Sequence, residues 1–391
     1  MPRIYADNAA TTKISQTAMK AMISAMENSY GNPSSIHQIG MAANDALQTA
    51  REQIARCLSC MPKEIFFTSG GTESDNQAIV SAAMLGAKQN KRHIISTAFE
   101  HHAVLHTLRR LKEQGFEIQL LDVGAEGNIT AAQVEEAIRP DTCLVTVMFA
   151  NNEIGSVLPI AEIGEVCRAH GVLFHTDAVQ AAGHIPVNVK KQNIDMLSLS
   201  AHKFHGPRGI GALYVKRGIE LTSLMEGGGQ ERGKRPGTEN LSAIMGMAAA
   251  LKEECSLMEE NAARVAAMRD RLLQGLFQIP YSILNGPRDN RLPGNVNFCF
   301  EGVSGESLLL FLDSKGICAS SGSACASGAL DPSHVLLALG LAPEIAQGSL
   351  RISLDISNTE EEIDYMLEVI PQVVEQLRGM SDDWQKRHCG D

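Results

Sequence analysis

Short apolar runs alternate with helical patterns along most of the chain, and this alternation limits its possible folds more than any other feature. EIFFTS is followed by TESDNQAIVSAAMLGA, RHIIST by HAVLHTLRRLKEQ, and TCLVTVMF by IAEIGEVCRAH. A strand followed by a helix at this spacing is typical of a mostly parallel sheet with helices on both faces. The sequence therefore predicts an α/β fold whose main domain is built on such a sheet.

The length of the chain and a late change of pattern indicate more than one domain. At roughly 100 to 200 residues per domain, 391 residues suggest two or three compact units. A helical pattern from about 240 to 276 leads away from the alternating region, and NVNFCF, SLLLFLDSKG and GSLRISL follow as a smaller α+β unit. We therefore predict a large domain over residues 16–259 and a small domain made of residues 1–15 and 260–391.

The charge balance and the lack of long apolar runs argue against several kinds of partner. The chain has 34 Lys and Arg residues against 45 Asp and Glu residues, a net charge of −11. Nucleic-acid binding needs clustered positive charge, so nucleic acid is not expected as the main partner. No run of about 18 consecutive apolar residues occurs, and the opening MPRIYADNAATTK has no apolar stretch of signal-peptide length. We expect a cytoplasmic protein with no membrane partner.

The nine cysteines are irregularly spaced, which favours reduced thiols over the disulfide framework of a small secreted domain. Cys57 and Cys60 form a single C-x-x-C, and no second pair completes a zinc set. A non-catalytic metal or sulfur-binding module that uses these two cysteines and the histidines is therefore the alternative from a different functional class.

Chemically reactive residues follow five of the apolar runs. TSGGTESDN follows EIFF, TAFEHH follows HIIS, ANNEIG follows VTVMF, TDAVQ follows VLFH, and AHKFHGPRG follows LSLS. In open α/β sheets the ligand site gathers beyond the carboxyl ends of the strands. The sequence therefore predicts one polar site at that edge of the sheet.

The residues after these strands match what a pyridoxal phosphate site requires. Lys203 can form a Schiff base once its amine is desolvated, and Asp177 can keep a pyridine nitrogen protonated. Gln180 can reach the phenolic oxygen of the ring, and Asn152 can support the same oxygen or the substrate. The plain alternatives are a surface lysine, a helix-capping aspartate and two ordinary loop amides.

The segment SGGTE is a candidate phosphate cup. The glycines, Gly71 among them, let backbone N–H groups approach an anion at a helix N-terminus, and Thr72 adds a hydroxyl. Ser200 and His202 beside the lysine would complete the cup, and Thr238 is a further hydroxyl candidate. No G-x-x-x-x-G-K-[ST] occurs, so a nucleotide is poorly supported, and simple helix capping is the alternative.

Two histidines begin the segment after the second strand. One of them, His101 or His102, could lie over a cofactor ring and move protons. Paired histidines at a helix start are more often solvated or capping, and a metal site would need converging ligands that the sequence does not supply.

The stretch SSGSACASGAL, residues 320–330, contains only small side chains apart from Cys325. Such a stretch packs poorly, so we expect a mobile loop that presents one thiol, with an incidental cysteine as the alternative. Arg351 lies in a strand pattern, where it could bind an α-carboxylate bidentately or pair with a local carboxylate.

Taken in order, GNPSS, FTSGGTESDN, EHHAVL, NNEIG, HTDAVQ, SAHKFHGPRGIG, GGGQERG, GTEN and SGSACASG closely resemble the NifS-like cysteine desulfurases, and they span nearly the whole chain. That family belongs to the fold-type I, aspartate-aminotransferase-like pyridoxal phosphate enzymes. The resemblance implies Lys203 as the cofactor-binding lysine, Asp177 at the pyridine nitrogen and Gln180 at the phenolic oxygen. It places His101 over the ring and Cys325 as the persulfide carrier.

The resemblance also implies the substrate, the assembly and the product. Asn152 and Arg351 would face L-cysteine, and a homodimer would bring Thr238 to the phosphate of the neighbouring subunit. The loop 319–332 resembles the longer, flexible version found in one group of the family. L-alanine would leave, and the persulfide would pass to an acceptor such as an iron–sulfur scaffold. No resident metal is expected, although Cys325 could be shared with a transient iron–sulfur cluster.

Several points stay open at the level of the sequence. His102 occupies a position that varies among relatives, and the tail DDWQKRHCGD carries an extra Cys389. A pyridoxal phosphate aminotransferase or a selenocysteine lyase would share the cofactor cup. Aminotransfer needs no mobile thiol, which speaks against the first, whereas the same site would accept selenocysteine. The sequence does not identify the sulfur acceptor.

Overall fold

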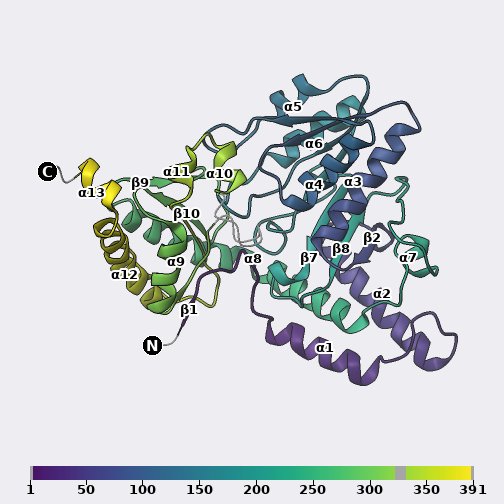
Figure 1. Ribbon diagram of the computed structural model, residues 1–391. Helices are drawn as coiled ribbons and strands as arrows, with labels where there is room; N and C mark the ends of the chain where they lie inside the picture. Colours follow the sequence, from purple (N-terminus) through teal and green to yellow (C-terminus); the bar gives the residue numbers. More distant parts are fainter. Residues whose placement is uncertain (1–2, 322–331, 389–391) are drawn as a thin grey trace.

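The computed structural model describes residues 3–321 and 332–388, and Cys325 and Cys389 lie outside these ranges. The described residues form a larger α/β part around a seven-stranded sheet and a smaller part beside it, which carries both ends of the described chain (Figure 1). The α/β fold with a large, mostly parallel sheet is confirmed.

The large sheet has the strand order β2-β8-β7-β6-β5-β3-β4. Strand β8 pairs antiparallel with both of its neighbours, and the remaining pairs are parallel. The strands are β2 (Ile65–Thr68), β3 (His93–Thr97), β4 (Glu117–Leu121), β5 (Thr142–Thr146), β6 (Leu173–Asp177), β7 (Met196–Ser200) and β8 (Gly211–Val215).

Both faces of this sheet are buried, which explains why its central strands read as continuous apolar runs. Successive side chains of a strand point to opposite faces, so Ile94 packs in one core cluster and Ile95 in the other. Leu144 and Val145 divide in the same way. The helices of this part are α1 (Gln16–Asn28), α2 (Gln38–Leu58), α3 (Gly71–Ala87), α4 (His102–Glu113), α5 (Ala131–Ala137), α6 (Ile160–His170) and α7 (Gln230–Gly233), with 3₁₀ turns η1 (Pro62–Glu64) and η2 (Ala201–Lys203).

Helix α8 (Leu241–Leu276) runs from the large core to a second core. Leu241 to Leu251 bury apolar side chains in the large core, and Val265 to Leu276 bury theirs in the second one. This is the connecting helix that the sequence pattern predicts from about 240 to 276. The domain limits after residues 15 and 259 stay a prediction.

The second core lies between helices and a three-stranded antiparallel sheet of order β12-β10-β9. The N-terminal strand β1 pairs in parallel with β11, so the first residues belong to this part of the molecule. Its elements are β1 (Ile4–Tyr5), β9 (Ser282–Leu284), β10 (Asn295–Phe300), α9 (Gly305–Ser314), β11 (Ile317–Cys318), β12 (Ser349–Ser353), α12 (Glu360–Gly379) and α13 (Asp382–His388). Helices α10 (His334–Ala338) and α11 (Pro343–Ala346) lie between β11 and β12 in the sequence but bury apolar side chains in the large core.

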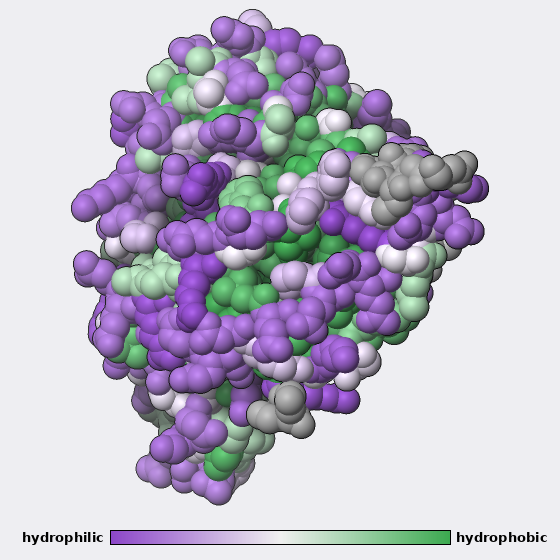
Figure 2. Space-filling view, turned by 90° about the vertical axis from the view of Figure 1, so that its left-hand side faces the viewer, coloured by the Kyte–Doolittle hydropathy of each residue, from purple (hydrophilic) through white to green (hydrophobic). Residues whose placement is uncertain are grey.

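The surface on the side of α12 and α13 is mostly hydrophilic, with hydrophobic residues gathered in smaller areas between hydrophilic ones (Figure 2). Among the residues that the structure describes, no helix combines the length and the apolar character needed to cross a bilayer.

Candidate active site

A cavity of about 250 Å³ lies beyond the carboxyl ends of β5, β6 and β7 and is closed on its other side by the N-terminal segment and β12. Ten of the twelve residues predicted from the sequence line it, so the structure brings them together at the expected edge of the sheet. They are Gly71, Thr72, His101, Asn152, Asp177, Gln180, Ser200, His202, Lys203 and Arg351.

Lys203 is the last residue of η2, the short turn that follows buried strand β7. Its Nζ donates hydrogen bonds to the carbonyl oxygens of Ala9 at 2.6 Å and Ala10 at 2.9 Å. These carbonyls come from the far end of the sequence and hold the amine at the wall of the cavity. The amine is therefore partly desolvated and directed toward the same space as the other predicted residues.

Asp177 ends strand β6 and is 6% exposed. The N–H of Val179 donates to its Oδ1 at 2.9 Å. Burial raises the pKa of this carboxyl to about 6, and the hydrogen bond and the positive charge of Lys203 oppose the shift. A buried carboxylate that lines a cavity is well placed to pair with a protonated ring nitrogen.

His101 is the N-cap of α4 and accepts a hydrogen bond at Nδ1 from the N–H of Ala103 at 3.1 Å. Burial, followed by the charge of Lys203, lowers its pKa to about 4. The imidazole is therefore neutral at pH 7, and because Nδ1 accepts, its proton lies on Nε2. In this state the ring can stack on a ligand or donate a hydrogen bond, but it needs an added negative charge nearby before it can act as an acid.

The candidate phosphate cup lies at the N-terminus of α3, whose first backbone N–H groups have no partner within the helix. A Cβ on Gly71 would lie 2.7 Å from Cγ2 of Val179, so only glycine fits at this position without a shift. A neighbouring hollow is lined by Thr72, Ser200 and His202, and Arg208 adds a positive charge to it.

His202 supports the same region as a neutral group. Its Nδ1 lies 3.1 Å from Oγ1 of Thr11. Burial, then Lys203 and Arg208, lowers its pKa to about 4. The two charged neighbours and the helix terminus make this end of the cavity attractive to an anion.

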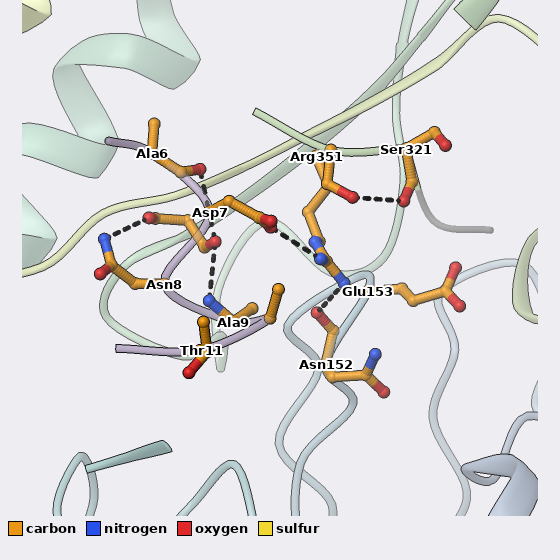
Figure 3. Close-up of polar contacts among 12 residues, drawn as sticks. Ala6, Asp7, Asn8, Ala9, Thr11, Asn152, Glu153, Ser321 and Arg351 are labelled. Carbon is orange, nitrogen blue, oxygen red and sulfur yellow. Dashed lines mark hydrogen bonds and ion pairs between the residues drawn. The ribbon is translucent and has the colours of Figure 1, made fainter. Parts of the chain in front are cut away.

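Arg351 lies in β12 and is 2% exposed. Its Nη2 pairs with Oδ1 of Asp7 at 2.9 Å, and its Nη1 donates to the carbonyl oxygen of Asn152 at 3.4 Å (Figure 3). Its Nε has no hydrogen-bond partner among the described residues. The structure therefore contains the local ion pair, and one buried nitrogen of the guanidinium remains without a partner among the described residues.

Gln180 also depends on the N-terminal segment, because its Nε2 donates to the carbonyl oxygen of Ala9 at 2.9 Å. Thr238 is exposed and does not line the cavity. The prediction for Cys325 falls outside the described residues.

Sequence reasoning missed several residues of the site. Asp7 and the carbonyls of Ala9 and Ala10 come from an opening segment that has no motif of its own, and only tertiary contact reveals them. Asp75 also lines the cavity. The signal for Asp75 is present in TESDN, where an aspartate follows the candidate phosphate cup by one helical turn.

Cys57 of the C-x-x-C pair lies next to Cys255 on α8, and both line one hollow of the surface. The thiol of Cys57 hydrogen-bonds with that of Cys255, on α8, rather than with Cys60. Within residues 3–321 and 332–388, no group of three or more His, Cys, Asp or Glu side chains is arranged to hold a metal ion.

The residues of the cavity fit pyridoxal phosphate on the chemistry of their donors. A lysine amine, a buried carboxylate and a neutral imidazole face one space, and a helix N-terminus with hydroxyl groups lies at one end of it.

Comparison with known proteins identifies the family. The family model described as "Aminotransferase class-V" matches residues 4–366, and the chain belongs to this family. Cysteine desulfurase IscS from Clostridium botulinum (strain Hall) is 49% identical over 98% of this chain and 97% of its own length. Its counterpart from Methanosarcina thermophila is 50% identical over 97% of this chain and 93% of its own length. A solved structure titled "NIFS-LIKE PROTEIN" has a TM-score of 0.90 at 38% identity and covers 96% of this chain and 100% of that one. The resemblance inferred from the sequence motifs is confirmed.

Proposed function

We propose that this protein is a pyridoxal phosphate-dependent cysteine desulfurase, which takes sulfur from L-cysteine, releases L-alanine and carries the sulfur as a persulfide on Cys325. The observation that carries the proposal is the common cavity of Lys203, Asp177 and His101 next to the N-terminus of α3. The near full-length similarity to cysteine desulfurases supports the choice of reaction.

Lys203 is the residue that binds the cofactor covalently. Its amine already lies within the cavity, held by two carbonyl oxygens that carry only partial negative charge. Asp177 pairs with the ring nitrogen, and Gln180 and Asn152 lie at the same cavity and serve the phenolic oxygen. The backbone of Gly71 and the side chains of Thr72, Ser200 and His202 hold the phosphate.

When bound, pyridoxal phosphate supplies an electron sink for the bond-breaking steps on the substrate. The amine of Lys203 would take the α-proton of the substrate at Nζ. His101 begins as a neutral ring and becomes able to move a proton when the bound anions raise its pKa. The thiolate of Cys325 would then attack the sulfur of the substrate, so that a sulfur–sulfur bond forms as the carbon–sulfur bond breaks. The electron pair of the broken bond would stay with the carbon fragment, and protonation of that carbon would give alanine.

Arg351 receives the carboxylate of the substrate. Its free Nε and its nearly complete burial favour a charge-assisted hydrogen bond to an anion. The ion pair with Asp7 holds the guanidinium in position before substrate arrives.

A homodimer accounts for two features that a single chain leaves unexplained. Thr238 is exposed in the segment before α8, and the resemblance to the desulfurases implies that it acts in the cup of a neighbouring subunit. The segment that includes α1 and the start of α2 exposes large apolar side chains, which a second copy would cover: Ile23, Met26, Tyr30, Ile36 and Met41. The sulfur would pass to a cytoplasmic acceptor such as an iron–sulfur scaffold.

The test of the reaction is mass spectrometry of the protein after incubation with L-cysteine. We expect one extra sulfur on the peptide that contains Cys325, removable by a thiol reductant. Cys325→Ala should still bind the cofactor and cysteine but should form no persulfide and should release alanine far more slowly. A persulfide on Cys57 or Cys389, or undiminished alanine release by the variant, would contradict the proposal.

A further inference from the structure

A second aspartate lies at the cofactor cavity, and the proposed chemistry leaves it without a role. Asp75 is in the second turn of α3, is 1% exposed and lines the cavity together with Asp177. Its Oδ1 has no hydrogen-bond partner among the described residues. A buried carboxylate with an unpaired oxygen is costly, so its charge state needs an explanation.

The groups behind Asp75 are buried and polar. Nε2 of His175 lies 3.7 Å from Oδ1 of Asp75 and 3.0 Å from Oγ of Ser198. Nδ1 of the same ring lies 2.8 Å from Oγ1 of Thr146. His175, Ser198 and Thr146 are all fully buried. Asp75 therefore faces a short chain of hydrogen-bonding groups, and it has no arginine or lysine as an ion-pair partner among them.

The titratable groups around Asp75 do not favour a negative charge on it. Burial, followed by the charge of Asp177, raises the pKa of Asp75 well above its usual range; a hydrogen bond with Ser198 opposes this shift, and the carboxyl of Glu100 adds to it. His175 could in principle compensate as an imidazolium, but burial lowers its pKa to about 3. The distance of 3.7 Å is also long for a charge-assisted hydrogen bond.

We infer that Asp75 is held as a neutral carboxylic acid at the cofactor cavity, so that Asp177 carries the negative charge there alone. Asp75 is in this view a positioning residue, because a second carboxylate beside Asp177 would repel its charge and favour its protonation. The role toward the cofactor rests on the proposed function. The neutral state of Asp75 does not, since it follows from burial and contacts of the protein alone.

The neutral state makes stability depend on pH in a defined direction. A carboxyl with a raised pKa in the folded protein binds its proton more tightly there than in the unfolded chain. Its contribution is therefore fully favourable at low pH and is lost as the pH rises from about 4, the usual aspartate pKa, through the raised folded pKa. Asp75→Asn keeps the size of the side chain and removes this loss.

The experiment is thermal unfolding of the apoprotein from pH 5 to pH 8 for the wild type, Asp75→Asn and Glu100→Gln. Glu100 is a second buried carboxyl, and burial raises its pKa to about 8. The Glu100→Gln variant therefore shows how large a change in the unfolding midpoint a buried carboxyl produces between pH 5 and pH 8. We expect the midpoint of Asp75→Asn, measured relative to wild type, to rise by several degrees between pH 5 and pH 8. A difference that is flat with pH, or that falls, would overturn the inference.

A second test separates a neutral pair of Asp75 and His175 from an ion pair of the two. These two states bind the same number of protons, so they give the same dependence of stability on pH. Infrared difference spectra of the apoprotein, wild type minus Asp75→Asn, should show the C=O stretch of a protonated carboxyl, and a carboxylate band in its place would overturn the inference. Both measurements use apoprotein, so their outcome is separate from whether Lys203 binds the cofactor.

Discussion

The two walls of the cavity are built in different ways. One wall comes from the large sheet, where Asp177 ends β6, Lys203 follows β7 and Gly71 begins the helix after β2. The other wall is formed by the opening segment around Asp7 and by Arg351 on β12, more than 300 positions apart in the sequence. The residues of the first wall lie close together because the carboxyl ends of neighbouring parallel strands meet at one edge of the sheet. The second depends on the two chain ends meeting at the small sheet.

This difference suggests that the two walls contribute to different steps, one to cofactor binding and chemistry and the other to substrate binding. The sheet wall supplies the lysine, the carboxylate and the phosphate-binding groups for the cofactor. Substitutions in this wall should therefore abolish turnover or weaken cofactor binding. The chain-end wall supplies a guanidinium that is already paired, so substitutions of Asp7 or Arg351 should mainly change how substrate is held. The backbone carbonyls of Ala9 and Ala10 on the same wall also hold the amine of Lys203.

The largest effect is expected at Lys203. Lys203→Ala should reduce turnover by about 10³-fold or more, because the variant loses both the covalent attachment and the base. Borohydride treatment of the wild type followed by peptide mapping should place the reduced cofactor on Lys203. A label on another lysine would show that the sheet wall has been assigned wrongly.

An intermediate effect is expected at Arg351 on the other wall. Arg351→Ala should raise KM for L-cysteine by about 10²-fold, the usual cost of a lost hydrogen bond to a charged group, with a smaller change in kcat. Steady-state kinetics measure this split. Arg351→Lys keeps the positive charge but lacks the planar guanidinium that binds a carboxylate through two hydrogen bonds, and it serves as the folding control. An equal loss in kcat at unchanged KM would assign this residue to the chemistry instead.

A smaller effect is expected at the glycine of the phosphate cup. Gly71→Ala places a methyl group against Val179, and overpacking of this kind costs roughly 1 to 3 kcal/mol. We expect about a 10-fold weaker affinity of the apoprotein for pyridoxal phosphate, measured by titration. The double variant Gly71→Ala, Val179→Ala should recover most of that affinity. If it does not, the methyl group acts on the backbone cup rather than on the neighbouring side chain.

Most of the sheet wall was predictable from the sequence because its residues sit next to strands that the apolar pattern reveals. Asp177, Ser200 and Lys203 lie at or just after the ends of apolar runs. Parallel strands bring their carboxyl ends to one edge of the sheet, so these residues meet there. The roles given to them still rest on resemblance and on the proposal.

The groups that complete the site were not predictable in this way. The carbonyl of Ala9, which holds both Lys203 and Gln180, comes from a segment without regular periodicity. Asp75 reads in the sequence as an ordinary helical aspartate, and only its burial next to Asp177 changes its expected charge. Likewise, the C-x-x-C suggested a partner for Cys57 that the packing of α2 on α8 replaces with Cys255.

By itself the sequence determined the class of fold, the connecting helix and the order of the reactive residues along one sheet edge, since each of these follows from periodicity within a short window. The tertiary structure alone decided which carbonyls hold the amine, which carboxylate pairs with Arg351 and how deeply each acid is buried. The physical reason is that burial and long-range pairing depend on residues that meet only after the chain ends have packed together, and these two factors set the charge of every group in the cavity.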